Sequence, residues 1–97
     1  MEAQPCVYIL TSRRNGTLYT GVTRYPVQRI WQHKEGPIRG FTKKYGVHRL
    51  VYIELHDTMP AAIQREKQIK EWKRAWKLEL IESMNPEWRD LFDDICR

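Results

Sequence analysis

Alternating apolar and polar positions near the N-terminus predict a β-hairpin. Residues 6–11 are rich in β-branched and aromatic types, which favour a strand. Asn15-Gly16 is a strong hairpin signal, and the segment after it, to about residue 22, predicts the returning strand. We therefore expect Tyr8 and Tyr19 to lie on neighbouring antiparallel strands.

A helical period follows the hairpin. Pro26 suits the first turn of a helix that would run to about residue 34, and we expect three of its side chains to pack inward: Val27, Ile30 and Trp31. Residues 35–46 hold three glycines among several basic side chains and predict a basic loop. Residues 49–55 are apolar enough to predict a third strand.

The C-terminal half has a mainly helical pattern. Thr58 or Asp57 can cap a helix over about residues 60–75, and a second helical stretch would run to about residue 83. Asn85-Pro86 ends it, because the residue before proline disfavours the helical conformation. A last amphipathic turn is expected to dock on the body of the protein through Trp88, Leu91, Phe92 and Ile95.

This order, β-β-α-β-α-α, predicts the α+β class, with a three-stranded antiparallel sheet flanked by helices. At 97 residues we expect a single domain over 1–97, with a core over about 5–83 and a C-terminal docking segment over 84–97. Cys6 and Cys96 lie far apart in the sequence, and we expect both to be free thiols in a cytoplasmic protein. No apolar run reaches the length of a membrane span.

Charge is distributed unevenly along the chain. Residues 1–77 carry 15 Lys and Arg against 6 Asp and Glu, whereas residues 78–97 carry 2 against 6. A basic body of this kind favours a polyanion such as nucleic acid, because neutralising phosphates releases condensed counterions. The charge also serves solubility, so charge alone does not decide between these two interpretations.

Glu66 is an acidic residue on the apolar side of the helix predicted over about 60–75. At 100° per residue its neighbours on that side are Ala62, Ile63 and Ile69. A carboxylate in such a place needs a cation, a metal or hydrogen-bond donors, since removing the partner of a buried charge costs about 3–5 kcal/mol. Two interpretations stay open: a functional carboxylate, or a salt bridge to Lys70, which lies four residues on.

Arg29 and His33 are four residues apart and would share one helical face. Arginine offers a bidentate fork to a phosphate, and histidine can move a proton or hold a tyrosine hydroxyl. On the second strand, Tyr19 and Gly21 would share a polar face, with the glycine leaving room beside the phenol. A solvated basic face and ordinary strand tyrosines are the structural alternatives.

Taken in this order, these residues resemble the GIY-YIG nuclease superfamily. Val7-Tyr8-Ile9 stands where the family has its first tripeptide, and Tyr19-Thr20-Gly21 where it has the second. Arg29 and His33 follow at the family's distances, and Glu66 lies in a later helix. The resemblance covers about residues 5–83 and extends to the small stand-alone bacterial branch, the YhbQ-like proteins. Two positions depart from the pattern without carrying chemistry, as Cys6 and Thr20 replace a glycine and an isoleucine.

The resemblance implies a metal-dependent endonuclease that hydrolyses DNA phosphodiester bonds by structure rather than sequence, in repair or recombination. Glu66 would bind a single Mg²⁺ or Mn²⁺ ion, and Tyr19 would be the general base. Tyr8 and His33 would position or assist it, and Arg29 would stabilise charge on the phosphate. Backbone phosphates would be held by Arg13, Arg14, Arg24, Arg39, Lys43, Lys44 and Lys70.

Two other functions stay open: a nucleic-acid-binding module without activity, and an adaptor that docks on a repair complex through the acidic C-terminal segment. The binding module would not need Glu66 and Tyr19 together, so their joint presence speaks against it. The sequence leaves the oligomeric state open, as it does the choice between DNA and RNA.

Overall fold

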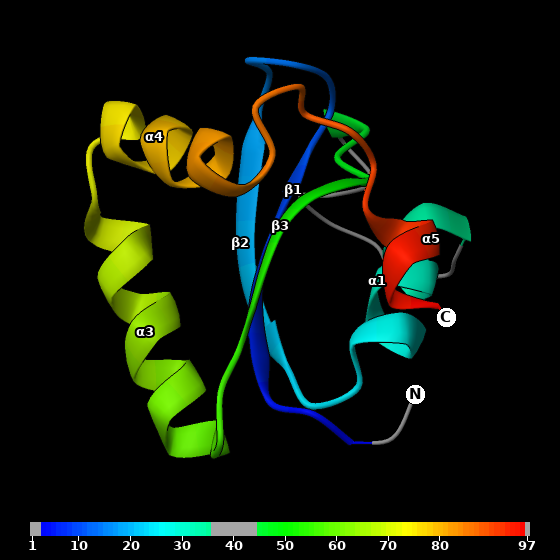
Figure 1. Ribbon diagram of the computed structural model, residues 1–97, viewed down its shortest axis with the longest axis vertical. Helices are drawn as coiled ribbons and strands as arrows, with labels where there is room; N and C mark the ends of the chain where they lie inside the picture. The colour runs from blue at the N-terminus through cyan, green and yellow to red at the C-terminus, as the bar shows by residue number, and fades with distance from the viewer. Residues whose placement is uncertain (1–2, 36–44, 97) are drawn as a thin grey trace.

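The protein folds into a three-stranded antiparallel sheet with helices on both faces. The computed structural model describes residues 3–35 and 45–96. Strand β1 (Cys6–Thr11) lies between β2 (Leu18–Thr23) and β3 (Arg49–Leu55), so that β2 and β3 form the two edges. The helices are α1 (Pro26–Glu35), α3 (Met59–Glu71), α4 (Arg74–Met84) and the short α5 (Phe92–Ile95). The α+β class and the strand pairing predicted from the sequence are confirmed (Figure 1).

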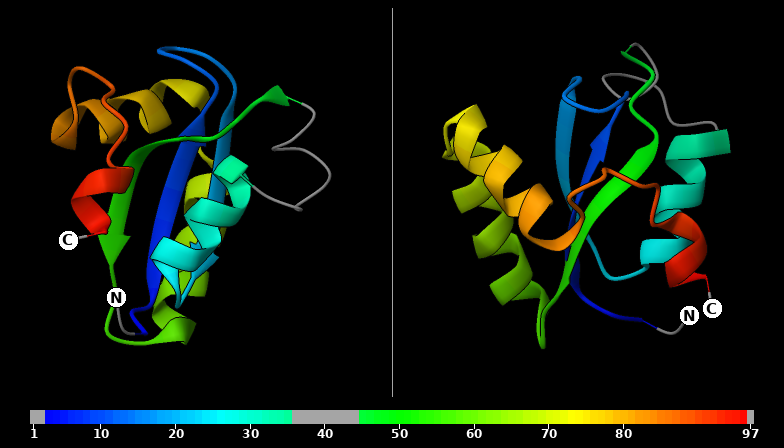
Figure 2. Two further views of the ribbon diagram at one scale, coloured as in Figure 1. Left: turned by 90° about the vertical axis from the view of Figure 1, so that its right-hand side faces the viewer. Right: turned by 45° about the horizontal axis from the view of Figure 1, so that its top comes forward.

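Residues on β1 alternate between two apolar layers. Val7 and Ile9 face the layer formed by α3 and α4, whereas Tyr8 and Leu10 face the layer that includes Ile30 of α1. Figure 2 shows the two groups of helices on opposite sides of the sheet. The central strand is buried over its whole length because helices cover both of its faces. The two faces of the sheet therefore carry different functional side chains.

The hairpin turn is built as its residues predict. Asn15 adopts the left-handed conformation with φ of 58°, which asparagine tolerates better than most residues, and the Gly16 N–H donates to the Arg13 carbonyl over 2.8 Å. Arg74 at the start of α4 donates to the carbonyls of Asn15 and Gly16 over 2.8 and 2.7 Å. This contact attaches α4 to the end of the hairpin.

Two local expectations are wrong. Trp31 does not pack inward: half of its surface is exposed, while Ile30 beside it is fully buried. Ile63 is likewise exposed, although Ala62 and Ile69 of the same helix are buried. Both α1 and α3 pack against the sheet through a narrow stripe of residues. An apolar side chain at the edge of that stripe, Trp31 or Ile63, therefore faces solvent.

The long C-terminal helical region breaks earlier than its sequence suggests. The helix that was predicted to reach residue 75 ends at Glu71, because Trp72 and Lys73 adopt extended conformations with ψ of 152° and 150°. Neither glycine nor proline marks this point in the sequence. Thr58 caps the start of α3, as its Oγ1 accepts from the Ala61 N–H over 3.2 Å.

The segment after α4 packs back on the sheet. Trp88 is fully buried, with its indole N–H donating to Glu82 over 2.9 Å, and the Leu91 N–H donates to the Leu50 carbonyl over 2.7 Å. Asn85 donates to the Val51 carbonyl over 3.1 Å. These contacts hold the C-terminal residues against β3.

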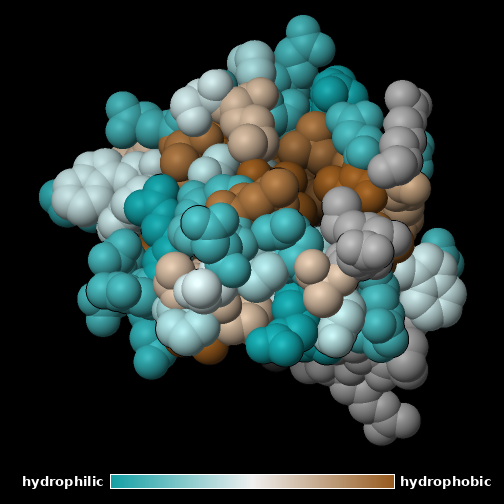
Figure 3. Space-filling view, turned by 60° about the horizontal axis from the view of Figure 1, so that its bottom comes forward, coloured by the Kyte–Doolittle hydropathy of each residue, from teal (hydrophilic) through white to brown (hydrophobic). Residues whose placement is uncertain are grey.

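Apolar side chains also reach the surface in places. On the face drawn in Figure 3 they gather in a band with hydrophilic side chains around it. Within the part of the chain that the structure describes, no helix has the length and apolar character needed to cross a bilayer.

Candidate active site

The pairing of β1 with β2 places the two tyrosines on one face. Tyr8 lies opposite Gly21 and Leu10 opposite Tyr19, and residues paired across an antiparallel ladder point the same way. The ring of Tyr8 lies directly over Gly21, where an added Cβ would come within 2.4 Å of Cζ and 2.5 Å of Oη. Glycine at this position is therefore what allows Tyr8 to lean across β2.

Helix α1 brings His33 to the same cluster. The Tyr8 hydroxyl and His33 Nε2 are 3.0 Å apart, and both side chains are buried. The Tyr19 ring centre lies 5.3 Å from that of His33 and 6.3 Å from that of Tyr8. Three proton-carrying side chains from β1, β2 and α1 therefore form one contiguous group.

Burial and the charge of Arg29 decide the protonation states in this group. Burial, with a smaller contribution from the positive charge of Arg29, lowers the pKa of His33 to about 4. Burial also raises the pKa of Tyr8, and the nearby Tyr19 adds to this, although a hydrogen bond and charge from Arg29 oppose it. At neutral pH the pair is a protonated phenol and a neutral imidazole. The Tyr8 hydroxyl can then donate a hydrogen bond to His33 Nε2.

Arg29 lines a pocket beside the tyrosine–histidine group. The pocket measures about 210 Å³ and is lined by Thr23, Tyr25, Gln28, Arg29 and Gln32. Arg29 Nη1 donates to Gln32 Oε1 over 3.5 Å. A guanidinium, two amides, a hydroxyl and a phenol suit an anionic, hydrogen-bonding ligand such as a phosphate. Gln28 and Gln32 were not predicted as site residues, although Gln32 lies four residues after Gln28 and three after Arg29 and so neighbours both on the helix surface.

Glu66 lies on the other side of the sheet. Its helix, α3, packs against β2 and β1 on the face opposite to the tyrosines, so the edge strand β2 separates the two parts of the predicted site. The Glu66 side chain is only 13% exposed, and Lys70 Nζ lies 3.2 Å from its Oε2. The salt bridge considered from the sequence is thus present, and little of the Glu66 side chain is exposed to solvent.

Glu66 is a lone carboxylate, which limits the kind of metal ion that it could bind. Among residues 3–35 and 45–96, no three His, Cys, Asp or Glu side chains form a group that could hold a metal ion. Magnesium is often held by one or two carboxylates and keeps several waters, so a lone carboxylate fits it better than a metal that needs a full protein cage. Because Lys70 contacts Oε2, Oε1 is the more available ligand atom.

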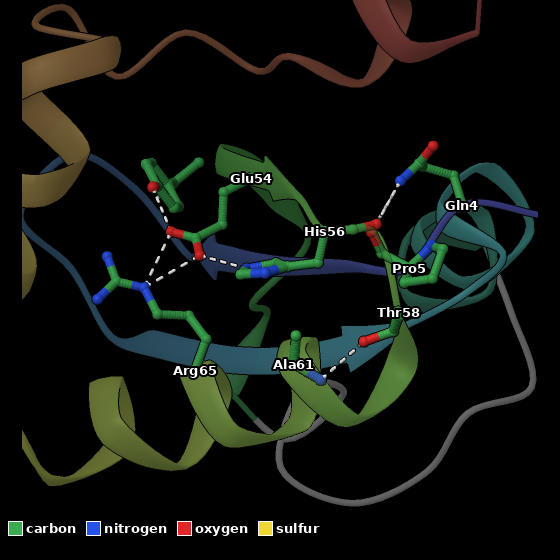
Figure 4. Close-up of polar contacts among 8 residues, drawn as sticks. Gln4, Pro5, Glu54, His56, Thr58, Ala61 and Arg65 are labelled. Carbon is green, nitrogen blue, oxygen red and sulfur yellow. Dashed lines mark hydrogen bonds and ion pairs between the residues drawn. The ribbon is translucent and has the colours of Figure 1, made fainter.

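A charged network holds α3 in place next to Glu66 (Figure 4). Arg65 Nε donates to both carboxylate oxygens of Glu54 on β3, over 3.0 and 3.2 Å. Tyr52 Oη and His56 Nε2 each lie 2.6 Å from the same carboxylate. Although burial alone would raise it, the pKa of Glu54 is lowered by these hydrogen bonds. Since Arg65 precedes Glu66, the network fixes the part of α3 that carries Glu66.

The predicted phosphate-binding residues fall into separate regions. Arg13 and Arg14 are exposed in the hairpin turn, and Arg24 is exposed at the other end of β2, which spans roughly 20 Å at about 3.3 Å per residue. Lys70 is half-exposed beside Glu66. The remaining three, Arg39, Lys43 and Lys44, lie outside the described residues.

The family model that describes the GIY-YIG catalytic domain matches residues 4–79, which include the tyrosines, Arg29, His33 and Glu66. The chain belongs to this family. The GIY-YIG domain implies a nuclease-type function and binding to nucleic acid, and nucleases of the family generally use a divalent metal.

Several curated relatives are small proteins of similar length. A UPF0213 protein of Syntrophus aciditrophicus is 40% identical over 84% of this chain and 92% of its own length. UPF0213 proteins of Natronomonas pharaonis and Oceanobacillus iheyensis are 38% and 34% identical, over 84% and 90% of this chain and 94% and 100% of their own lengths. The chain thus matches nearly the whole length of several small relatives within the GIY-YIG family.

A solved structure has the same architecture. The solution structure of a UPF0213 protein from Bacillus halodurans matches with a TM-score of 0.56 and 26% identity, over 90% of this chain and 92% of that one. The α+β arrangement of this GIY-YIG protein is therefore shared with an experimentally determined relative.

Proposed function

We propose that this GIY-YIG protein is a divalent-metal-dependent endonuclease that hydrolyses DNA phosphodiester bonds, with a preference for DNA structure over sequence. The convergence of Tyr8, Tyr19 and His33 beside the Arg29 pocket is the observation that carries the proposal. A tyrosine–histidine group for proton transfer next to a cationic pocket for a phosphate is the arrangement that phosphodiester hydrolysis requires. A preference for branched or flapped DNA would suit a role in repair or recombination.

Each residue of the group has a distinct role in the proposal. Tyr19 would be the general base that takes the proton from the attacking water. Tyr8, held as a protonated phenol on neutral His33, would keep the imidazole in place and orient the water. Arg29 would stabilise the negative charge that develops on the phosphate oxygens, with Gln28 and Gln32 completing the pocket.

Glu66 would hold the metal from the opposite side of the edge strand. A bound Mg²⁺ or Mn²⁺ would supply Lewis-acid stabilisation of charge on the phosphate and the leaving oxygen. The low exposure of Glu66 and its pairing with a single lysine support this role, because the carboxylate keeps one oxygen for a further ligand. The substrate backbone would then lie along β2, between Arg29 on one face and Glu66 on the other.

The proposal is tested by cleavage of end-labelled single-stranded, duplex, flap and branched DNA with Mg²⁺ or Mn²⁺. Glu66→Gln keeps the shape of the side chain and removes its charge, and Glu71→Gln at the exposed end of the same helix is the matched control. We expect cutting to require the metal, to disappear in Glu66→Gln and to survive in Glu71→Gln, while DNA binding persists in both. Salt-sensitive binding without cutting on any of these substrates would refute the nuclease proposal.

A further inference from the structure

An aromatic pocket lies between the end of α3 and α4, away from the tyrosine–histidine group. It measures about 550 Å³ and is lined by Trp72, Trp76, Glu79, Leu80 and Ser83. Trp76 is 50% exposed, which is unusual for the largest apolar side chain. The function proposed above makes no use of this pocket.

The break between the two helices creates the pocket. Because Trp72 and Lys73 are extended, α4 turns away from the axis of α3, as Figure 1 shows. The remaining lining residues, 76, 79, 80 and 83, follow the i, i+3, i+4, i+7 spacing and therefore share one face of α4. The indoles of Trp72 and Trp76 meet edge to face, with their centres 6.3 Å apart at 80°. They form two walls of the pocket, and half of the surface of Trp76 is exposed.

Positive charge surrounds the open tryptophan. Residues 70–77 carry four basic side chains and one acidic one, Glu71. Lys73 Nζ lies 5.6 Å from the centre of the Trp76 ring, so a cation sits beside the aromatic face. An aromatic platform with cations around it is how proteins bind unpaired nucleotides, because the base stacks while the phosphates meet the charges. An acidic or purely apolar partner would use only one of these two features.

Glu79 and Ser83 bring hydrogen-bond acceptors to the pocket. Glu79 contributes a carboxylate, which accepts only. The Ser83 hydroxyl already donates to the Leu80 carbonyl over 2.7 Å, so its oxygen remains available to accept. A ligand that presents N–H donors suits these acceptors, and the exocyclic amino group of cytosine is a donor that a carboxylate recognises. Thymine has a single donor, N3–H, and the carbonyl oxygens on either side of it would lie close to the carboxylate.

We propose that this pocket binds one unpaired, amino-bearing nucleobase, with cytosine preferred over thymine, from a strand whose phosphates contact the basic residues of 70–77. The inference rests on the proposed function, since it takes nucleic acid as the substrate. It adds a second contact point that selects single-stranded character, located on the helix that follows the one carrying Glu66. A nuclease with such a contact would prefer DNA with an unpaired segment beside the cleavage site.

The test is equilibrium binding of fluorescently labelled dC12 and dT12 in EDTA, so that no cleavage occurs. Trp76→Ala removes the platform, and Trp76→Phe retains a smaller one. Met84→Ala is the matched control, because Met84 is also 50% exposed on α4 but lies outside the pocket. We expect Trp76→Ala to weaken dC12 binding by roughly 5- to 100-fold with an unchanged salt dependence, Trp76→Phe to recover part of it, and Met84→Ala to have no effect.

A second variant tests base selection separately from stacking. The wild type should bind dC12 about tenfold more tightly than dT12, and Glu79→Gln should reduce this ratio without abolishing binding. If the wild type binds both oligonucleotides but Trp76→Ala and Glu79→Gln behave like Met84→Ala, the pocket proposal is wrong while the nuclease proposal stands. If the wild type binds no oligonucleotide or flap DNA, both proposals fail.

Discussion

Replacing Gly21 by alanine tests how closely Tyr8 packs across β2. In an open strand position the change should stabilise the fold, because glycine costs roughly 0.5–1 kcal/mol relative to alanine in a strand interior. Here the new Cβ would lie 2.4 Å from Tyr8 Cζ and 2.5 Å from its Oη, and neither the paired backbone nor the buried ring can move freely. Gly21→Ala should therefore destabilise the fold instead of stabilising it.

The magnitude follows from two contributions. Overpacking of a buried side chain costs about 1–3 kcal/mol. Displacing the ring also stretches the 3.0 Å hydrogen bond between Tyr8 and His33, which contributes on the order of 1 kcal/mol. After the gain from removing glycine, Gly21→Ala should destabilise the protein by about 1–3 kcal/mol. The melting temperature should fall by roughly 4–8 °C for each kcal/mol in a domain of this size.

The assay is urea unfolding followed by circular dichroism, with the slope of free energy against urea checked for constancy. The matched background is Tyr8→Leu, which removes the ring atoms that the new Cβ would meet. In that background Gly21→Ala should be neutral or stabilising by a few tenths of a kcal/mol. A stabilised Gly21→Ala single variant, or an equal cost in both backgrounds, would refute the packing argument.

Three further predictions concern titratable groups. Because the pKa of His33 is lowered to about 4 in the fold, the unfolded chain takes up a proton first, so stability should fall by about 2 kcal/mol between pH 7 and pH 5. His33→Gln should remove that pH-dependent part, and an unchanged pH profile of unfolding would contradict the assignment. Arg65→Met should destabilise by about 2–3 kcal/mol at pH 7, because Glu54 loses the charge-assisted hydrogen bonds from the guanidinium. Because the pKa of Glu54 is lowered in the fold, the difference in unfolding free energy between wild type and Arg65→Met should become smaller in acid, where the carboxyl is protonated. Denaturation of both proteins at pH 7 and at pH 3 measures this difference. Burial raises the pKa of the Cys6 thiol to about 11, so iodoacetamide at pH 8 should modify exposed Cys96 quickly and Cys6 only on unfolding. Mass spectrometry measures the two rates, and equal rates would contradict this prediction.

Much of the site is local in origin and could be predicted from the sequence. Strand alternation with Asn15-Gly16 predicted that Tyr8 and Tyr19 would be on neighbouring strands, and the i, i+4 spacing predicted that Arg29 and His33 would share a helical face. The contact between His33 and Tyr8 depends on α1 packing on that side of the sheet, which spacing within the helix does not determine. The space that Gly21 leaves was expected, but the residue filling it, Tyr8, is seen only in the structure.

The sequence by itself thus determined the order of the elements, the pairing of the hairpin strands, and the helical face that Arg29 shares with His33. Only the tertiary structure decided that Glu66 lies across β2 from the tyrosines, that Glu54 meets Arg65, and that the helix breaks at Trp72. The physical reason is the separation along the chain over which each interaction acts. Periodicity and capping act over a few residues, whereas the meeting of two faces depends on burial and charge pairing between segments far apart in the chain.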